Sequence, residues 1–196
     1  MYDAIVVGAR CAGAPTAMLL ARKGYRVLLV DRATFPSDLV LSTHFVWQPG
    51  IARLQRWGLL DNIRASHCPP IAFFHLDLGP FTLTGAPPPA EGVTTAYSPR
   101  RIVLDYALVE AAVAAGAELR EGFAVQELLR DGDRVAGIRG RATGGKTVTE
   151  GARIVIGADG MHSLVARAVH AEAYHTTTPT PRHLLHLLEW GPYGWL

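Results

Sequence analysis

A glycine-rich turn between an apolar strand and a helix constrains the fold of this chain more than any other feature. Residues 2–7 are apolar and rich in β-branched side chains, as expected of a buried parallel strand. Gly8 and Gly13 bracket the break that follows, and residues 14–23 then show a helical pattern. Residues 26–30 form a second apolar segment. This order predicts a βαβ unit with two parallel strands.

The turn matches most of the G-x-G-x-x-G pattern that binds dinucleotides. Gly8 permits the tight turn and Gly13 lets the helix pack closely on the strand, so that main-chain N–H groups face a diphosphate. Asp31, at the end of the second strand, is placed to bind an adenosine ribose. Arg10 replaces the middle glycine, and its side chain either hinders the diphosphate or pairs with it. The turn residues expected to contact a dinucleotide are Gly8, Ala9, Arg10, Cys11, Ala12 and Gly13.

Beyond Asp31 the pattern departs from that of a plain NAD dehydrogenase, which continues with further strand–helix–strand units. Residues 32–47 are irregular, and helices are expected at 49–57 and 101–116. Alternating residues at 71–84 predict strands with one wet face. An antiparallel meander is expected over 123–128, 134–139 and 146–150, and a separate buried strand over 153–156.

Four segments in this order resemble FAD-dependent oxidoreductases of the aromatic-hydroxylase and geranylgeranyl-reductase type, which have a glutathione-reductase-like FAD fold. They are the opening turn with Asp31-Arg32, the Ile51–Asp61 helix ending in Gly-Leu-Leu-Asp, Arg101-x-x-Leu-Asp with Ala115–Glu118 closing that helix, and Gly157–Arg167 with its Asp-Gly pair. The resemblance implies an α/β fold: a Rossmann-like FAD-binding domain with a parallel sheet, an antiparallel β-meander and a partial antiparallel substrate-domain sheet.

The resemblance also implies further cofactor contacts. Arg101 would lie against the FAD, and Asp159 and Gly160 would lie near its diphosphate and the path of a nicotinamide donor. Val125 falls where the chain passes the adenine, and Arg32 follows the ribose-binding acid. Each contact has a simpler interpretation. Arg101 could be a surface arginine at a helix start, and Val125 a buried strand valine. Asp159-Gly160 could be only a turn, followed by Ser163 as a helix N-cap. His44 falls in a stretch that would approach the flavin ring, although a loop histidine is commoner.

By this resemblance residues 1–170 form the FAD-binding domain, with 65–98 as a partial insertion of the substrate domain. The sequence changes character at residues 171–196. Members of the family are longer and carry a second Gly-Asp motif beyond this point, so a C-terminally truncated or frameshifted chain is expected. His183 and His186 lack a third ligand at metal-site spacing, and no metal is expected.

The chemistry implied is that of a flavoenzyme with NADH or NADPH as electron donor and a small organic molecule as substrate. Hydroxylation by a monooxygenase is the first interpretation, and reduction of a carbon–carbon double bond is the second. An inactive nucleotide-binding remnant and an NAD-dependent dehydrogenase are the alternatives. The residues do not indicate a catalytic side chain, and they leave the substrate and the oligomeric state open.

Charge and cysteine content narrow the expected partners. A net charge of +2, from 19 basic and 17 acidic residues, gives no reason to expect nucleic acid or an anionic membrane. No apolar stretch approaches the length that spans a bilayer. The two cysteines, Cys11 and Cys68, do not suggest a disulfide framework, and a cytoplasmic location is expected.

Overall fold

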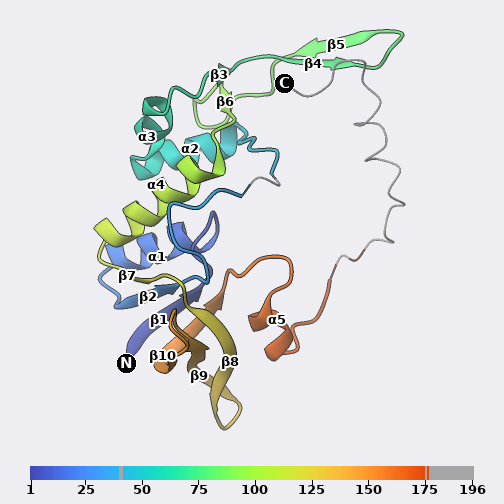
Figure 1. The fold of residues 1–196 in the computed structure, drawn as a ribbon. Coiled ribbons are helices and arrows are strands. Elements are labelled where there is room, and N and C mark those ends of the chain that lie inside the picture. The colour runs from blue at the N-terminus through green and yellow to red at the C-terminus, as the bar shows by residue number, and fades with distance from the viewer. Residues whose placement is uncertain (40–41, 175, 177–196) are drawn as a thin grey trace.

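A computed structural model describes residues 1–39, 42–174 and 176 of the chain (Figure 1). Its centre is a six-stranded sheet in the order β7-β2-β1-β10-β9-β8. The strands β1 (Tyr2–Val7), β2 (Val27–Val30), β7 (Glu118–Arg120) and the second half of β10 (Thr147–Gly157) run parallel. All four residues of β2 are buried, as are five of the six in β1. The expected βαβ unit and mixed α/β architecture are confirmed.

The antiparallel meander is continuous with this parallel sheet. Strands β8 (Ala124–Asp131) and β9 (Arg134–Arg141) pair with each other, and β9 pairs with β10 between Thr147 and Gly151. From Ala152 onward β10 leaves β9 and pairs with β1. The expected division into strands 146–150 and 153–156 was therefore wrong. The partner exchange changes the burial pattern half-way along one strand, which in the sequence looks like two segments.

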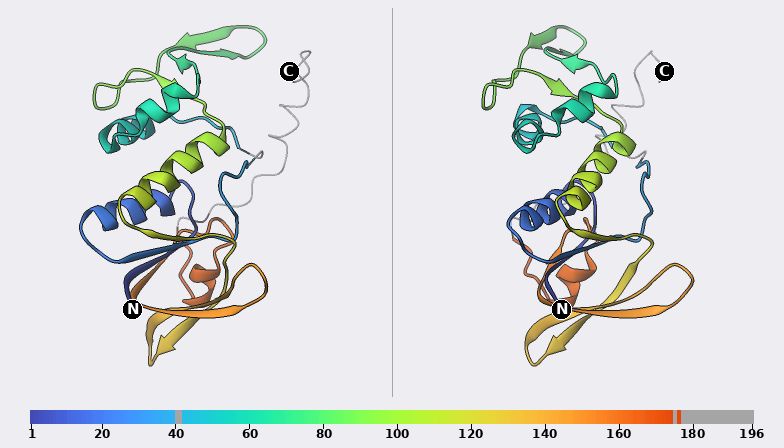
Figure 2. Two further views of the ribbon diagram at one scale, coloured as in Figure 1. Left: turned by 60° about the vertical axis from the view of Figure 1, so that its left-hand side comes forward. Right: turned by 90° about the vertical axis from the view of Figure 1, so that its left-hand side faces the viewer.

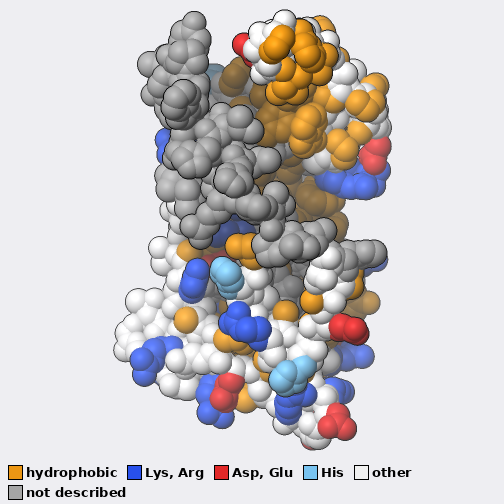
Figure 3. Space-filling view, turned by 90° about the vertical axis from the view of Figure 1, so that its right-hand side faces the viewer, with side chains coloured by type: hydrophobic (Ala, Val, Ile, Leu, Met, Phe, Trp, Pro, Cys, Tyr) orange, Lys and Arg blue, Asp and Glu red, His pale blue; other side chains and the backbone are white. Residues whose placement is uncertain are grey.

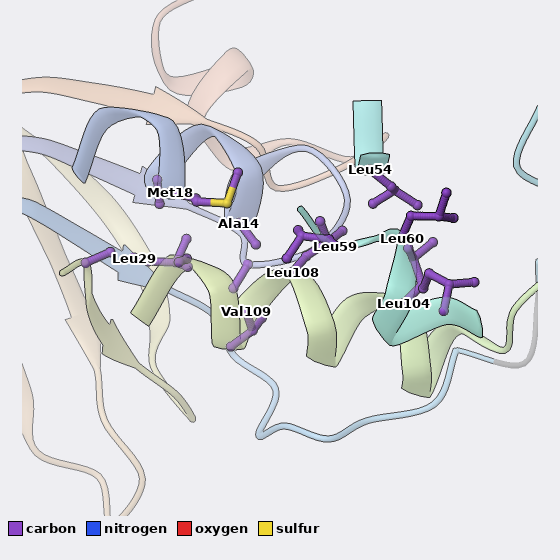
Figure 4. Packing of buried hydrophobic residues seen from close by; sticks show 14 of the residues in the cluster. Ala14, Met18, Leu29, Leu54, Leu59, Leu60, Leu104, Leu108 and Val109 are labelled. Carbon is purple, nitrogen blue, oxygen red and sulfur yellow. The ribbon is translucent and has the colours of Figure 1, made fainter. Parts of the chain in front are cut away.

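Helices α1 (Gly13–Arg22) and α4 (Arg101–Ala114) pack against each other on one side of the sheet, and α2 (Gln48–Trp57) and α3 (Leu60–Ala65) continue that layer (Figures 1 and 2). Figure 4 shows Met18 of α1, Leu29 of β2 and Leu108 of α4 within their common core. Helix α5 (Leu164–Ala168) contacts β8 and β10, and Val165 joins a second core cluster with Phe123 and Ile138.

The sequence did not predict α3, β6 (Ala96–Tyr97) or β7, and it suggested α5 only through the alternative in which Ser163 is a helix N-cap. Helix α4 ends at Ala114, and Gly116, with a φ of 101°, turns the chain into β7. The Ala115–Glu118 segment closes the helix as expected, because Ala115 is its C-cap and the Ala117 amide donates to the Ala112 carbonyl at 3.0 Å, and its last residue, Glu118, begins β7. These elements are short, so their periodicity is too brief to be recognised against the neighbouring glycines.

The β4 (Phe74–Asp77) and β5 (Thr82–Gly85) hairpin projects from the end of the molecule opposite the meander (Figure 1). A second pair, β3 (Pro70–Ile71) and β6 (Ala96–Tyr97), lies at its base. Every residue of β5 is exposed and three of the four in β4 are, so the expectation of one wet face was wrong: both faces of the hairpin are open. Figure 3 shows hydrophobic side chains gathered at this end.

The assignment of residues 65–98 to a separate unit stays a prediction. The greater part of the 171–196 tail, with His183 and His186, lies outside the described residues. Among the helices that are described, none has the length and apolar character needed to cross a membrane.

Candidate cofactor-binding site

The sheet register brings three of the expected site segments to one edge. Val7 of β1 is aligned with Val30 of β2 on one side and with Gly157 of β10 on the other. The residues that follow, Gly8, Asp31 and Ala158, therefore meet at the carboxyl ends of neighbouring parallel strands. In open α/β sheets this is the edge where nucleotides bind.

Packing explains both glycines of the turn. Gly8 has a φ of +100°, in the left-handed region that favours glycine. A Cβ on Gly8 would lie 2.3 Å from the carbonyl oxygen of Ala158, and a Cβ on Gly13 only 1.7 Å from the carbonyl oxygen of Gly8. The absence of both side chains lets α1 start directly against β1 and β10.

The turn is open to solvent and offers unpaired main-chain donors. Cys11 and Ala12 are exposed, whereas Ala9 and Gly13 are buried. Within the part of the chain that the structure describes, no acceptor is recorded for the Ala12 amide. The first N–H groups of a helix have no partner inside the helix and are available to an anion.

Asp31 lies beside this turn, as expected from the sequence. Its Oδ2 accepts a hydrogen bond from the Ala9 amide at 2.7 Å, and its Oδ1 accepts one from the Ala33 amide at 2.8 Å. A carboxylate oxygen can accept more than one hydrogen bond, so Asp31 retains capacity for a ligand hydroxyl. The neighbouring Arg32 is exposed.

The Asp-Gly pair after β10 closes the other side of the turn. The Asp159 Cα would lie 3.1 Å from a Cβ on Gly8. Its carboxylate accepts hydrogen bonds from the Leu164 amide at 2.6 Å and from the Ser163 hydroxyl at 2.5 Å. Ser163 also accepts from the Ala166 amide at 2.9 Å, which confirms it as the N-cap of α5. Asp159 is thus held rigidly by the helix that follows it.

A buried carboxylate joins the turn to α4. Asp105 is 0% exposed and accepts hydrogen bonds from Arg101 Nε at 3.1 Å and Nη2 at 2.9 Å. Arg10 Nη1 donates to the same carboxylate at 2.7 Å, while Arg10 Nη2 donates to the Ser37 hydroxyl at 3.0 Å. The Cys11 thiol lies 3.3 Å from it. Sequence reasoning missed this role of Asp105, although its i,i+4 spacing from Arg101 was a usable signal.

The surroundings of Cys11, including this carboxylate, shift the ionisation of its thiol. Desolvation, followed by the negative charge of Asp105, raises the pKa of the Cys11 thiol to about 11. The thiol is therefore protonated near neutral pH, which lowers its reactivity as a nucleophile there.

Two other candidates, Val125 and His44, have contacts within the protein. Val125 is half-buried in β8, where it pairs with Gly140 and packs against the second core cluster. His44 has a φ of 58°, and its amide donates to the Ser42 hydroxyl at 3.1 Å. Neither contact by itself indicates a ligand.

Residues 1–189 match the family described as FAD binding domain. The chain belongs to this family. Among similar proteins, FixC of Salmonella typhi is 32% identical over 89% of this chain and 41% of its own length. Digeranylgeranylglycerophospholipid reductase of Methanosarcina acetivorans is 32% identical over 85% of this chain and 40% of its own. The structure of the myxobacterial FAD-dependent halogenase CndH matches with a TM-score of 0.69 and 26% identity, over 79% of this chain and 36% of that one.

These matches confirm the resemblance to the FAD-dependent oxidoreductases and the FAD-binding fold. The chain spans about two-fifths of the length of the relatives that it matches. The described residues fit an FAD molecule at the turn, because the open Ala12 amide, the Asp31 carboxylate and the closely packed Gly8 and Gly13 lie at the same edge of the sheet.

Proposed function

We propose that this chain is the FAD-binding part of a flavin-dependent oxidoreductase. The observation that carries the proposal is the position of Asp31, whose carboxylate is bonded to the Ala9 amide of the open glycine turn. An acid at this position binds the adenosine ribose, while the turn and the positive end of α1 bind the diphosphate. FAD, when bound, supplies the electron-transfer chemistry, and the protein supplies orientation and electrostatics.

Each expected contact has a defined role in this proposal. The open amides of the turn, such as that of Ala12, bind the diphosphate, and the Asp31 carboxylate binds the ribose. The Gly8 and Ala9 amides already donate to the Val30 carbonyl and to Asp31 and hold the turn in place. Arg101, held by Asp105, adds positive charge on the same side of the turn. The backbone of Val125 lies along the adenine. Further contacts are assigned to Arg32, Asp159 and Gly160, of which Asp159 lies against Gly8.

NADH or NADPH is the proposed electron donor, and a small organic molecule the substrate. A monooxygenase that hydroxylates this substrate remains the first proposal for the whole protein. A double-bond reductase is the second, and the 32% identity to digeranylgeranylglycerophospholipid reductase specifically favours it. The described cysteines, Cys11 and Cys68, are both free thiols, which supports a reducing, cytoplasmic location.

FAD titration of the purified apoprotein tests the cofactor assignment. We expect saturable quenching of flavin fluorescence, with NAD unable to displace FAD. Asp31→Ala should weaken FAD binding roughly tenfold or more, because a charge-assisted ligand contact is lost. Asp61→Ala is the matched control, since that acid lies on the surface of α3 and pairs with Arg64, and the FAD affinity of this variant should equal that of the wild type. Equal affinities for all three proteins, or preferential NAD binding, contradict the proposal.

The two reactions differ in what they consume. A monooxygenase consumes oxygen together with NAD(P)H, whereas a double-bond reductase consumes NAD(P)H and its alkene in equal amounts under anaerobic conditions. Product analysis by mass spectrometry separates them, because hydroxylation adds an oxygen atom and reduction adds two hydrogens. Absence of both activities in protein that binds FAD would limit this chain to cofactor binding.

A further inference from the structure

Arg10 stands at the position where the dinucleotide pattern has its middle glycine. That glycine normally lets the main chain approach the diphosphate. The Arg10 side chain extends instead toward α4 and the loop after β2, where Asp105 and Ser37 accept its two terminal nitrogens. Its guanidinium also lies 5.5 Å from the centre of the Phe35 ring. The side chain is thereby fixed at three points, and it is only 25% exposed.

Asp105 is the partner that anchors this arrangement. The carboxylate is completely buried, and such a charge needs full compensation by cations and hydrogen bonds. Arg101 occupies both oxygens from its own helix, but it leaves room on Oδ2 for Arg10, which approaches from 95 residues away in the sequence. An asparagine there would carry no charge, would offer one acceptor oxygen in place of two, and would turn an NH2 donor group toward the two arginines.

We propose that Asp105 is a positioning residue of the cofactor site. By holding the Arg10 side chain sideways, it allows an arginine to stand where the diphosphate needs a glycine. This inference rests on the proposed FAD binding at the turn. It resolves the two sequence interpretations of Arg10: the side chain neither blocks nor binds the diphosphate, because Asp105 and Ser37 engage it.

The inference makes the importance of Asp105 dependent on Arg10. Without Asp105, the freed guanidinium competes for the space that the cofactor needs and must be displaced or ordered on binding. Without Arg10, there is no side chain to hold away, and the loss of Asp105 affects Arg101 and the Cys11 thiol alone among the contacts described above. The two substitutions should therefore be strongly non-additive.

Dissociation constants for FAD, measured by fluorescence quenching on the full chain, test this coupling. We expect Arg10→Gly to bind FAD within about fivefold of the wild type, and Asp105→Asn to bind it more than about fivefold more weakly. In the Arg10→Gly background, the factor by which Asp105→Asn weakens FAD binding should be at most half of its value in the wild-type background. In the matched Arg101→Gln background, Asp105→Asn should still weaken FAD binding, because the substitution still releases the Arg10 side chain.

Thermal unfolding of each apoprotein separates a positioning role from a structural one. If Asp105 had only a structural role, Asp105→Asn would lower the Tm, and Arg10→Gly would not selectively restore FAD affinity. A penalty undiminished by Arg10→Gly, or Asp105→Asn binding FAD as tightly as the wild type, overturns the inference. If Asp105→Asn does not fold, Arg10→Gly decides alone, and a loss beyond about fivefold identifies Arg10 as a ligand. Wild-type protein that binds no FAD refutes the proposed function itself, and this inference with it.

Discussion

Substitution of Gly13 by alanine should damage both the fold and the cofactor site. The added Cβ would lie 1.7 Å from the Gly8 carbonyl oxygen, 2.9 Å from the Gly8 carbonyl carbon and 3.2 Å from the Ala158 Cβ. Two of these contacts are backbone atoms, which no rotamer change can relieve. Normal van der Waals separation would require α1 to shift by roughly 1.5 Å.

Such a shift would disturb the best-packed part of the molecule. Ala14, Ala17 and Met18 of α1 are fully buried, and the helix packs on both α4 and β2. Overpacking at a rigid site typically costs 1–3 kcal/mol, so we expect a loss of about 3 kcal/mol in the free energy of unfolding. For a chain of this size that corresponds to a fall in Tm of roughly 6–12 °C.

Differential scanning calorimetry of the apoprotein measures this effect. Gly85→Ala is the matched control, because a Cβ on Gly85 meets nothing within 4 Å, and its Tm should stay within about 2 °C of the wild type. FAD affinity of Gly13→Ala, measured where the protein is folded, should also fall about tenfold, since the start of α1 is displaced. A Gly13→Ala Tm within about 2 °C of the wild type would refute the packing argument.

Three further perturbations test the site. Asp31→Ala should retain the native circular dichroism spectrum while FAD affinity drops roughly tenfold or more; unchanged affinity removes Asp31 from the site. Ser163→Ala removes the N-cap of α5 and should cost about 1 kcal/mol, or roughly 2–4 °C in Tm by calorimetry, and no change would show that the cap is dispensable. Cys11, in a Cys68→Ala protein, should react with iodoacetamide only slowly up to pH 9 and faster toward pH 11, because its raised pKa keeps the thiol protonated. The thiol of the unfolded chain ionises at lower pH than that of the folded protein, so the free energy of unfolding should fall as pH rises from 9 to 11. An alkylation rate that reaches half its maximum at or below pH 9 contradicts the raised pKa of Cys11.

Local sequence signals were sufficient for the cofactor turn. The apolar strand, Gly8, Gly13 and the acid at Asp31 are each recognisable without tertiary information, because βαβ packing imposes these residue types at fixed places. The register of the sheet then confirmed that the turn, Asp31 and the segment after β10 share one edge.

Strand pairing and ion pairs between residues far apart in the sequence could not be predicted in the same way. The partner exchange within β10 depends on which strand lies beside it, and a single sequence does not state that. Likewise, Arg10 could be recognised as a departure from the pattern, but the carboxylate that pairs with it lies on a helix 95 residues further along the sequence.

The sequence by itself determined the type of cofactor unit, since close backbone approach permits few residues at the turn. Only the tertiary structure decided how the exception at Arg10 is accommodated. The compensation comes from Asp105, which is buried beside the turn because α4 packs on α1. Electrostatic pairing in a folded protein follows spatial neighbours, and these are set by packing rather than by distance along the chain.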